Sequence, residues 1–106
     1  MEQTPIVVLV TTSSKEEAEK IARHLLEMKL IACANIIGPI SSLFWWHGKI
    51  DTAQEHIILM KTRKDLFGKL SERVKALHSY QVPEIIAAPI VEGFKPYIEW
   101  LENALR

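Results

Sequence analysis

The sequence predicts an α+β fold of the ferredoxin-like βαββαβ type, with a long β-hairpin, an antiparallel sheet and an extra C-terminal helix. Two observations predict it. Runs rich in β-branched residues alternate with stretches of helical periodicity, and two long apolar runs are separated only by a short turn signal. We expect residues 1–106 to form a single domain, because this length lies within the usual range for one.

The first strand and the first helix have clear signals. Residues 6–10 form an unbroken run of Ile, Val and Leu, which is typical of a strand covered on both faces or central in its sheet. Ser14 followed by Glu17 forms a capping box, which predicts that a helix begins after Ser14. Apolar residues at helical spacing extend this helix to about Lys29.

The middle of the chain predicts a hairpin that is longer than one small sheet needs. Its first arm runs from Leu30 to Trp46, and Gly38-Pro39 interrupts it as a bulge or an edge position would. The returning arm runs from Ile50 to Thr62. A turn centred on Gly48 and Lys49 would join the two arms, and it would place His56 opposite Ser41.

The last third of the chain predicts a helix, a strand and a second helix. The first of these helices carries apolar residues at helical spacing from Leu66 to Leu77, and the strand runs from Glu84 to Ile90. The C-terminal helix begins after Gly93 and tolerates Pro96 in its first turn. The helices of the two crossovers cover one face of the sheet. Because the hairpin is apolar on both faces, we expect a partner subunit to cover the rest.

Composition and charge argue against several partner classes. Thirteen basic and thirteen acidic residues are interspersed, so no basic stripe predicts binding to nucleic acid. The chain up to Thr12 has no basic leader, and its apolar run is too short for a membrane span, so we expect no membrane partner. Cys33 is the single cysteine and cannot form an intramolecular disulfide, which favours a reducing, cytoplasmic location.

The residues form no catalytic constellation, so we expect a protein that is not an enzyme. The four glycines do not have the spacing of a phosphate-binding loop. Asp51 and Glu55 project from the same side of a strand, and a charged edge that resists aggregation accounts for them. Trp45 and Trp46 could stack on a ligand, although aromatic residues in a hairpin of this kind more often fill an interface.

Soft metal ligands are few. Cys33 lies in an apolar strand, where it either packs as a small hydrophobe or serves as a reactive or metal-binding thiol. The four histidines lack the spacing of a zinc site. His78, at the end of the second helix, is favoured there by the helix dipole or has a functional role. The residues alone therefore predict an oligomeric ferredoxin-like binding module.

Five segments together resemble the CutA family of divalent-cation tolerance proteins. They occur in the family's order over nearly the whole chain, at residues 30–36, 46–50, 61–62, 78–85 and 97–101. The chain departs from the family pattern at Ser79, where relatives usually have proline, and at His47, where they often have an acidic residue. The resemblance implies a homotrimer whose hairpins complete sheets between subunits. It also implies a role in tolerance of, or response to, divalent metal ions, chiefly copper, through binding of the metal ion.

The resemblance assigns few site residues. Copper-binding relatives use a cysteine at the end of the first strand and a histidine pair before the tyrosine. These positions are Val10 and Leu77-His78 here, so only His78 matches. Cys33 is the remaining soft donor for copper or another divalent cation, and no tightly bound cofactor is expected. The alternative is a PII-like trimer that senses a small molecule and signals to a partner protein. Its intersubunit cleft would contain Trp46, Lys61, His78, Tyr80 and Glu84.

Overall fold

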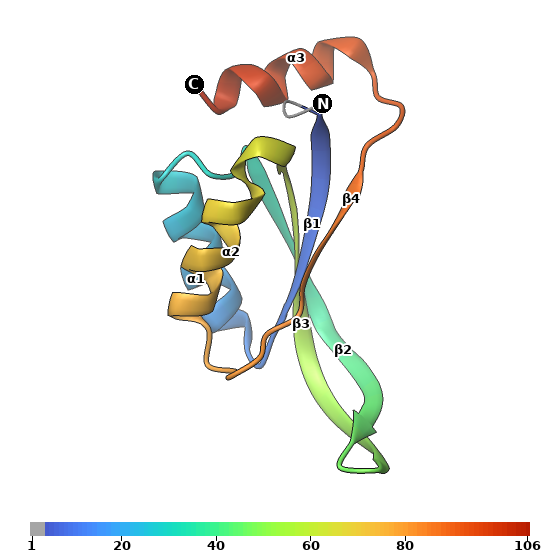
Figure 1. Cartoon of the computed structure of the whole chain (residues 1–106). Coiled ribbons are helices and arrows are strands. Elements are labelled where there is room, and N and C mark those ends of the chain that lie inside the picture. Colours follow the sequence, from blue (N-terminus) through green and yellow to red (C-terminus); the bar gives the residue numbers. More distant parts are fainter. Residues whose placement is uncertain (1–3) are drawn as a thin grey trace.

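The computed structural model describes residues 4–106, so Met1 to Gln3, on which the expectation of no leader partly depends, lie outside the described residues. It confirms the predicted α+β fold and the order of its elements (Figure 1). In chain order these are β1 (Pro5–Thr12), α1 (Lys15–Glu27), β2 (Cys33–Trp46), β3 (Lys49–Arg63), a 3-10 turn (Lys64–Leu66), α2 (Phe67–Leu77), β4 (Ile85–Pro89) and α3 (Lys95–Ala104).

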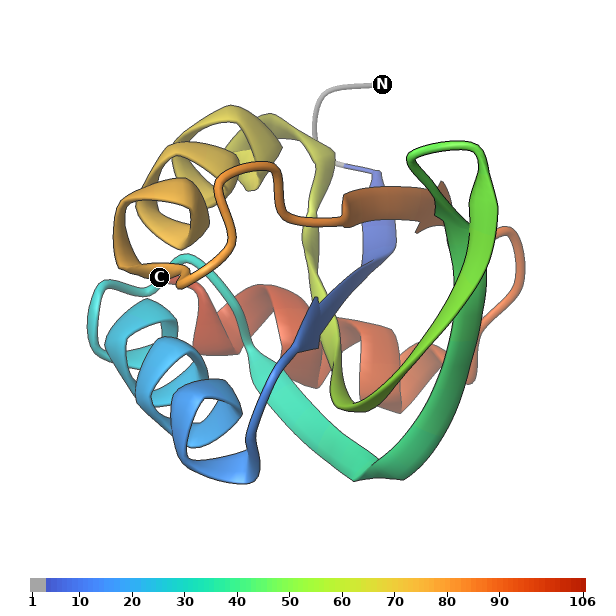
Figure 2. The ribbon, with the colours of Figure 1, turned by 90° about the horizontal axis from the view of Figure 1, so that it is seen from below.

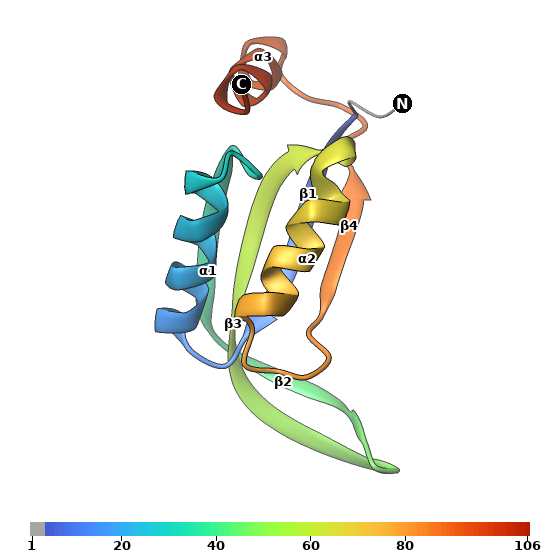
Figure 3. The same cartoon turned by 60° about the vertical axis from the view of Figure 1, so that its left-hand side comes forward.

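The four strands form one antiparallel sheet in the order β2-β3-β1-β4. β1 is an interior strand, which agrees with its continuous apolar run. Figure 3 shows α1 and α2 on one face of the sheet, while α3 crosses the end at which β1 begins. The hairpin of β2 and β3 extends beyond the opposite end, and Figure 2 shows it curving away from the side on which α1 and α2 lie.

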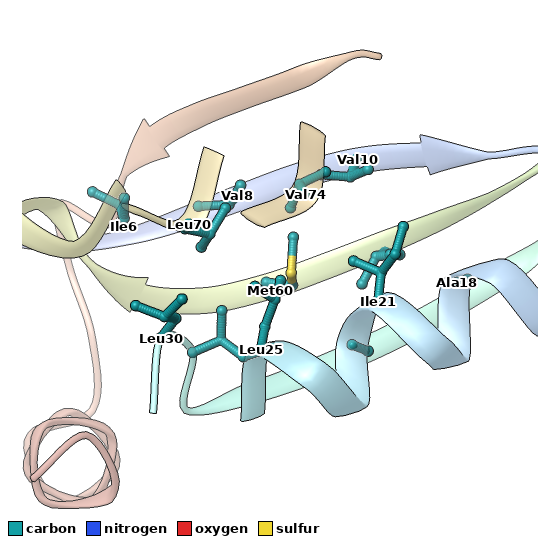
Figure 4. Packing of buried hydrophobic residues seen from close by; sticks show 13 residues of the cluster. Ile6, Val8, Val10, Ala18, Ile21, Leu25, Leu30, Met60, Leu70 and Val74 are labelled. Atoms are coloured by element: carbon teal, nitrogen blue, oxygen red, sulfur yellow. The ribbon is translucent and has the colours of Figure 1, made fainter. Parts of the chain in front are cut away.

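The main core lies between the sheet and the helices α1 and α2 (Figure 4). Alternate residues of β1 point toward the helices, because the side-chain period of a strand is two. Each helix contributes one apolar stripe. Fully burying a side chain of the size of Val, Leu, Ile or Met stabilises the fold by roughly 1.5–3 kcal/mol. The fully buried members of this core are Val8, Val10, Ala18, Ile21, Leu25, Ile31, Ile58, Met60, Leu70 and Val74.

The start of α1 differs from the predicted capping box in one bond. Ser14 Oγ accepts a hydrogen bond of 3.1 Å from the Glu17 N–H, as predicted. Glu17 Oε1, however, accepts from the backbone N–H and the hydroxyl of Ser13, one residue earlier than a capping box requires. The physical reason is the other oxygen of Glu17, which accepts from the N–H of Ser79 and so draws the carboxylate toward the loop after α2.

The hairpin contains the predicted irregularity at Gly38-Pro39, where the β2–β3 register shifts between Ile37 and Ile40. Its turn lies one residue earlier than predicted. Trp46 pairs with Lys49, so the turn residues are His47 and Gly48, with φ of 50° and 75°. Both φ values are positive, as a type I′ turn demands, and the predicted centre on Gly48 and Lys49 was wrong.

The corrected turn also changes the pairing of the hairpin histidines. Ser41 pairs with Gln54, and His56 instead lies beside the bulge, where its ring packs under Gly38. At the opposite end of the sheet, α3 buries Leu101 and Leu105 against Ala32. No helix within residues 4–106 is long and apolar enough to cross a membrane.

Candidate functional site

A groove of about 990 Å³ lies between the hairpin and the segment that follows α2, and we call it the hairpin groove. Three of the five residues that the sequence assigned to a ligand cleft line it together: Trp46, Tyr80 and Glu84. Its lining consists of Thr11, Ser42, Leu43, Phe44, Trp46, Asp51, Ala53, Glu55, Tyr80, Gln81, Val82 and Glu84.

Strand geometry builds one wall of the groove. Asp51, Ala53 and Glu55 alternate along β3, so their side chains share one face of the hairpin. The register places Phe44 of β2 opposite Asp51, so an aromatic ring and a carboxylate are neighbours across the ladder. The hairpin therefore presents acidic and aromatic side chains together on the face that lines the groove.

Tyr80 joins the loop after α2 to this wall. Its hydroxyl donates a hydrogen bond of 2.6 Å to Glu55 Oε2, and Glu55 is only 8 % exposed. Burial, the hydrogen bond to Glu55 and the negative charge of Glu17 together raise the pKa of Tyr80, so its hydroxyl stays protonated as a donor. The edge-charge interpretation was therefore wrong for Glu55, which is buried and paired, while Asp51 is exposed as expected.

His78 lies behind the groove and is 9 % exposed. Its Nε2 is 2.7 Å from the carbonyl oxygen of Thr11, which can only accept, so Nε2 carries a proton. Its Nδ1 accepts the N–H of Tyr80 at 3.0 Å. Both ring nitrogens are thus used in positioning the loop, and a metal ion could bind His78 only after one of these bonds broke.

Two further residues fix the loop in place, and the sequence analysis did not assign them to the site. Glu17 Oε2 accepts from the N–H of Ser79 at 2.6 Å. Burial alone would raise the pKa of Glu17, but hydrogen bonds from Ser79 and Ser13 outweigh it and lower that pKa below 4.5. Thr11 Oγ1 donates to Glu84 Oε1 at 3.4 Å. The only sequence signal for Glu17 was its place in the capping box, which does not reveal a partner 62 residues away.

Lys61 and Cys33 lie elsewhere. They pair with each other across β2 and β3, and Lys61 Nζ donates to Asn35 Oδ1. Lys61 also pairs with Val7, four residues before Thr11 on β1, and thus roughly 13 Å along the strand from the contact of His78. The structure therefore does not place Lys61 in the groove or Cys33 beside His78.

Cys33 has a neighbour of its own at the start of β2. It is partly buried, and its Sγ lies 3.6 Å from the hydroxyl of Tyr97 in α3. The hydrogen bond with Cys33, followed by burial and the charge of the thiolate, raises the pKa of Tyr97. Cys33 is therefore not sealed in the core.

One subunit does not offer a copper site. Within residues 4–106, no three side chains of His, Cys, Asp or Glu are grouped so that they could hold one metal ion. His78 has no free ring nitrogen, and Cys33 lies apart from it. A lone imidazole and a distant thiol do not make a tight site for copper.

The family described as CutA1 divalent ion tolerance protein matches residues 6–104. The Divalent-cation tolerance protein CutA of Archaeoglobus fulgidus is 47% identical over 98 residues, which are 92% of this chain and 95% of that protein. The protein of the same name from Thermus thermophilus is 50% identical over 97 residues, or 92% of this chain and 94% of the relative.

A plant relative is longer than this chain. Protein CutA 1, chloroplastic, of Oryza sativa is 46% identical over 101 residues, which are 95% of this chain but 57% of that protein.

Among solved structures, the periplasmic divalent cation tolerance protein CutA from Archaeoglobus fulgidus superposes with a TM-score of 0.93 at 45% identity. The match covers 96% of this chain and 99% of that one, so sequence and fold agree with these relatives over nearly all of the described residues.

Proposed function

This chain belongs to the CutA1 divalent ion tolerance protein family, and we propose that it contributes to cellular tolerance of divalent metal ions, chiefly copper, as a homotrimer. The names of the relatives from Archaeoglobus and Thermus support the link to divalent cations. The assembly carries no tightly bound cofactor and acts by binding, not as an enzyme. Its proposed location is the cytoplasm, because its single cysteine suits a reducing compartment.

One observation carries the proposed assembly: the far part of the hairpin, residues 40–55, which we call the distal hairpin, exposes large apolar side chains. Leu43 is 69% and Trp45 is 73% exposed, and Trp46 and Ile50 are also exposed. Side chains of this size clustered at one end of a small protein are typical of a surface that a partner covers. The sheet also has open edges at β2 and β4, which can pair with strands of another copy.

A second apolar surface supports the same proposal. Leu9, Leu59 and Ile86 lie side by side in the ladder and face away from α1 and α2, and Ile86 is 55% exposed. Burial of both surfaces between copies would give this small domain a larger core than one chain provides. In such an assembly, soft donors of different subunits can approach one another. We therefore propose that copper contact is made between subunits, with Cys33 as the more accessible donor and with His78 as a donor that requires one of its two ring hydrogen bonds to open.

Calorimetric titration of the reduced protein with Cu(I), Cu(II) and Zn(II) tests the metal proposal. We expect saturable copper binding at a whole-number ratio to the trimer, with loss of that binding in His78→Gln and Cys33→Ser. The glutamine keeps an N–H that can reach the Thr11 carbonyl but removes the imidazole. His47→Asn is the matched control, since asparagine tolerates the positive φ of the turn. Unchanged copper titrations in both variants would overturn the direct role of these donors.

The hairpin groove favours a second candidate function, a PII-like trimer that senses a small molecule and signals to a partner protein. Trp46, Tyr80 and Glu84 converge on one groove of about 990 Å³ that combines apolar walls with a few polar groups, which is the usual character of a ligand pocket. Because the distal hairpin forms one wall of the groove, the proposed assembly would turn the groove into an intersubunit cleft. Lys61, which was also predicted for the cleft, would join it only from another subunit.

A further inference from the structure

We propose that the hairpin groove binds a small organic cation, with one or more ammonium groups on an apolar skeleton. The proposal rests on the second candidate function, the ligand-sensing trimer, and names the chemical class of its ligand. It depends on three features of the groove: the sign of its charge, one buried carboxylate with an unused oxygen, and the aromatic rings beside the carboxylates.

The charge of the groove has one sign. Asp51, Glu55 and Glu84 line it, and none of the described lining residues is a lysine, arginine or histidine. A second hollow, between Arg63 and α3, shows the contrast. It is lined by two arginines and two glutamates, so its charges balance. Although the formal net charge of the whole chain is zero, the charged residues that line the hairpin groove are all negative. Such a cleft attracts cations and repels carboxylate and phosphate ligands.

Glu55 is the independent observation that points to a ligand. More than nine-tenths of the residue is buried, and its Oε2 accepts the hydroxyl of Tyr80. Its Oε1 has no hydrogen-bond partner among the described residues, although the side chain lines the groove. Among the described residues only His56 Nδ1 is a buried side-chain polar atom without a partner, so Glu55 Oε1 is reached by solvent from the groove. An ammonium group in the groove would replace that water with a charged donor of the opposite sign, and hydrogen bonds between ionised groups are the stronger kind.

The other walls suit the carbon skeleton of an amine. Phe44, Trp46 and Tyr80 place aromatic rings beside the carboxylates, and Leu43 and Val82 add apolar surface. The face of an aromatic ring attracts a cation within about 6 Å of its centre. Aromatic rings next to carboxylates therefore recognise an ammonium group on a hydrocarbon chain better than a neutral or an anionic molecule.

The geometry favours an extended cation over a bare metal ion. The three carboxylates are distributed around a groove of about 990 Å³, and residues 4–106 contain no group of three side chains that could hold a metal ion. A divalent metal needs oxygen ligands within about 2.0–2.6 Å of one point. An extended polyamine can instead place separate ammonium groups near separate carboxylates.

Calorimetric titration of the intact protein tests the proposal with three probes of similar length. Spermidine is the cation, 1,8-octanediol is the neutral control, and suberate is the anionic control. We expect saturable binding of spermidine at a fixed ratio per subunit and no saturable binding of the other two. The proposal would be overturned if suberate or octanediol bound as tightly as spermidine. It would also be overturned if Zn(II) bound in the groove as a coordinated ion and displaced spermidine.

Variants separate the groove from general attraction of a polycation to acidic surface. Glu55→Gln retains an acceptor for Tyr80 but removes the charge, and we expect spermidine affinity to fall about tenfold or more. Asp51→Asn tests the same point at an exposed residue, and Trp46→Leu should lower the affinity a few-fold through the lost ring. Glu92→Gln, an exposed carboxylate outside the groove lining, is the matched control and should bind as the wild type does. Equal affinity in Glu55→Gln, Asp51→Asn and the control would overturn the assignment.

The same samples distinguish this proposal from the proposed function. A trimer by light scattering that does not bind spermidine would overturn the ligand class and leave the assembly standing. A monomer that binds spermidine with loss in Glu55→Gln would overturn the assembly and leave the groove as a cation site of the single chain.

Discussion

The strand β3 passes through two regions of the molecule that differ in what covers them. Where it runs beside β1, Ile58, Met60 and Thr62 are fully buried beneath α1 and α2. Where it runs through the distal hairpin it pairs with β2 alone, and Ile50 is exposed. The two parts also differ in sequence, since residues 49–55 are mostly polar whereas residues 57–60 are Ile, Ile, Leu and Met. β3 is therefore apolar and buried where another element covers it, and the exposed apolar side chains of the distal hairpin lie mainly on β2, at Leu43, Trp45 and Trp46.

The hairpin groove lies at the boundary between these two regions. The loop after α2 is fixed to the helix-covered region through Glu17 and through His78, which bonds to Thr11. From there Tyr80 reaches to Glu55 at the start of the uncovered region. The groove is therefore anchored on the rigid region, while its opposite wall belongs to the region that is available to a partner.

The largest effect should come from the helix-covered region. Leu25→Ala removes a fully buried side chain from the core, and we expect the free energy of unfolding to fall by about 3 kcal/mol. Leu26→Ala, one residue on along α1 and 39% exposed, is the control and should cost less than half as much. Chemical unfolding at one fixed protein concentration measures both. Equal losses of unfolding free energy in the two variants would contradict the difference in burial between Leu25 and Leu26.

An intermediate effect is expected at the start of the distal hairpin. A Cβ added at Gly38 would lie 2.5 Å from His56 Cδ2, so Gly38→Ala should lower stability by roughly 2 kcal/mol. Combining it with His56→Ala should remove the part of this cost that the ring contact causes, because the two sites are in contact, and leave the part due to the φ of 159° at Gly38. Gly68→Ala in α2, where a Cβ meets nothing within 4 Å, is the control and should stabilise the helix slightly. Additive effects of Gly38→Ala and His56→Ala in denaturant unfolding would contradict the contact.

The smallest of these effects concerns the link that fixes the loop. Glu17→Gln weakens the hydrogen bonds to Ser13 and Ser79, and we expect a loss of about 1 kcal/mol at pH 7. Because the folded pKa of Glu17 lies below 4.5, its charge stabilises the fold above that value, and this stabilisation disappears as the pH falls through the lower folded pKa. The difference from the wild type should therefore shrink in acid.

Glu16→Gln is the control for this pH dependence, since Glu16 also lies in the first turn of α1 but is exposed. It shares the effect of the helix dipole and lacks the bonds to the loop. A difference between wild type and Glu17→Gln that stays constant from pH 7 to pH 3 would show that the Glu17 charge does not hold the loop.

The sequence predicted the fold well because local signals specify it. The β-branched run of β1, the cap at Ser14 and the stripe of α1 each report on neighbours within a few residues. The turn was misplaced by one residue because a histidine with positive φ at His47 is uncommon, so Gly48 alone gave the signal. Short-range chemistry thus indicated the elements and left one register ambiguous.

The site could be predicted only in part. The resemblance suggested Trp46, Tyr80 and Glu84, and the structure brings them together. The partners that give the groove its character are set by tertiary packing, since Tyr80 and Glu55 are 25 residues apart. A local pattern does not encode such a contact, and it could not show that Glu55 is buried or that both nitrogens of His78 are already bonded.

We propose that other copies of the chain cover the distal hairpin, and light scattering of the purified wild type across micromolar concentrations tests this assembly. We expect a mass of three chains of 12.1 kDa that does not fall on dilution. A mass of one chain throughout that range would contradict it, because the distal hairpin would then remain exposed in solution without a partner.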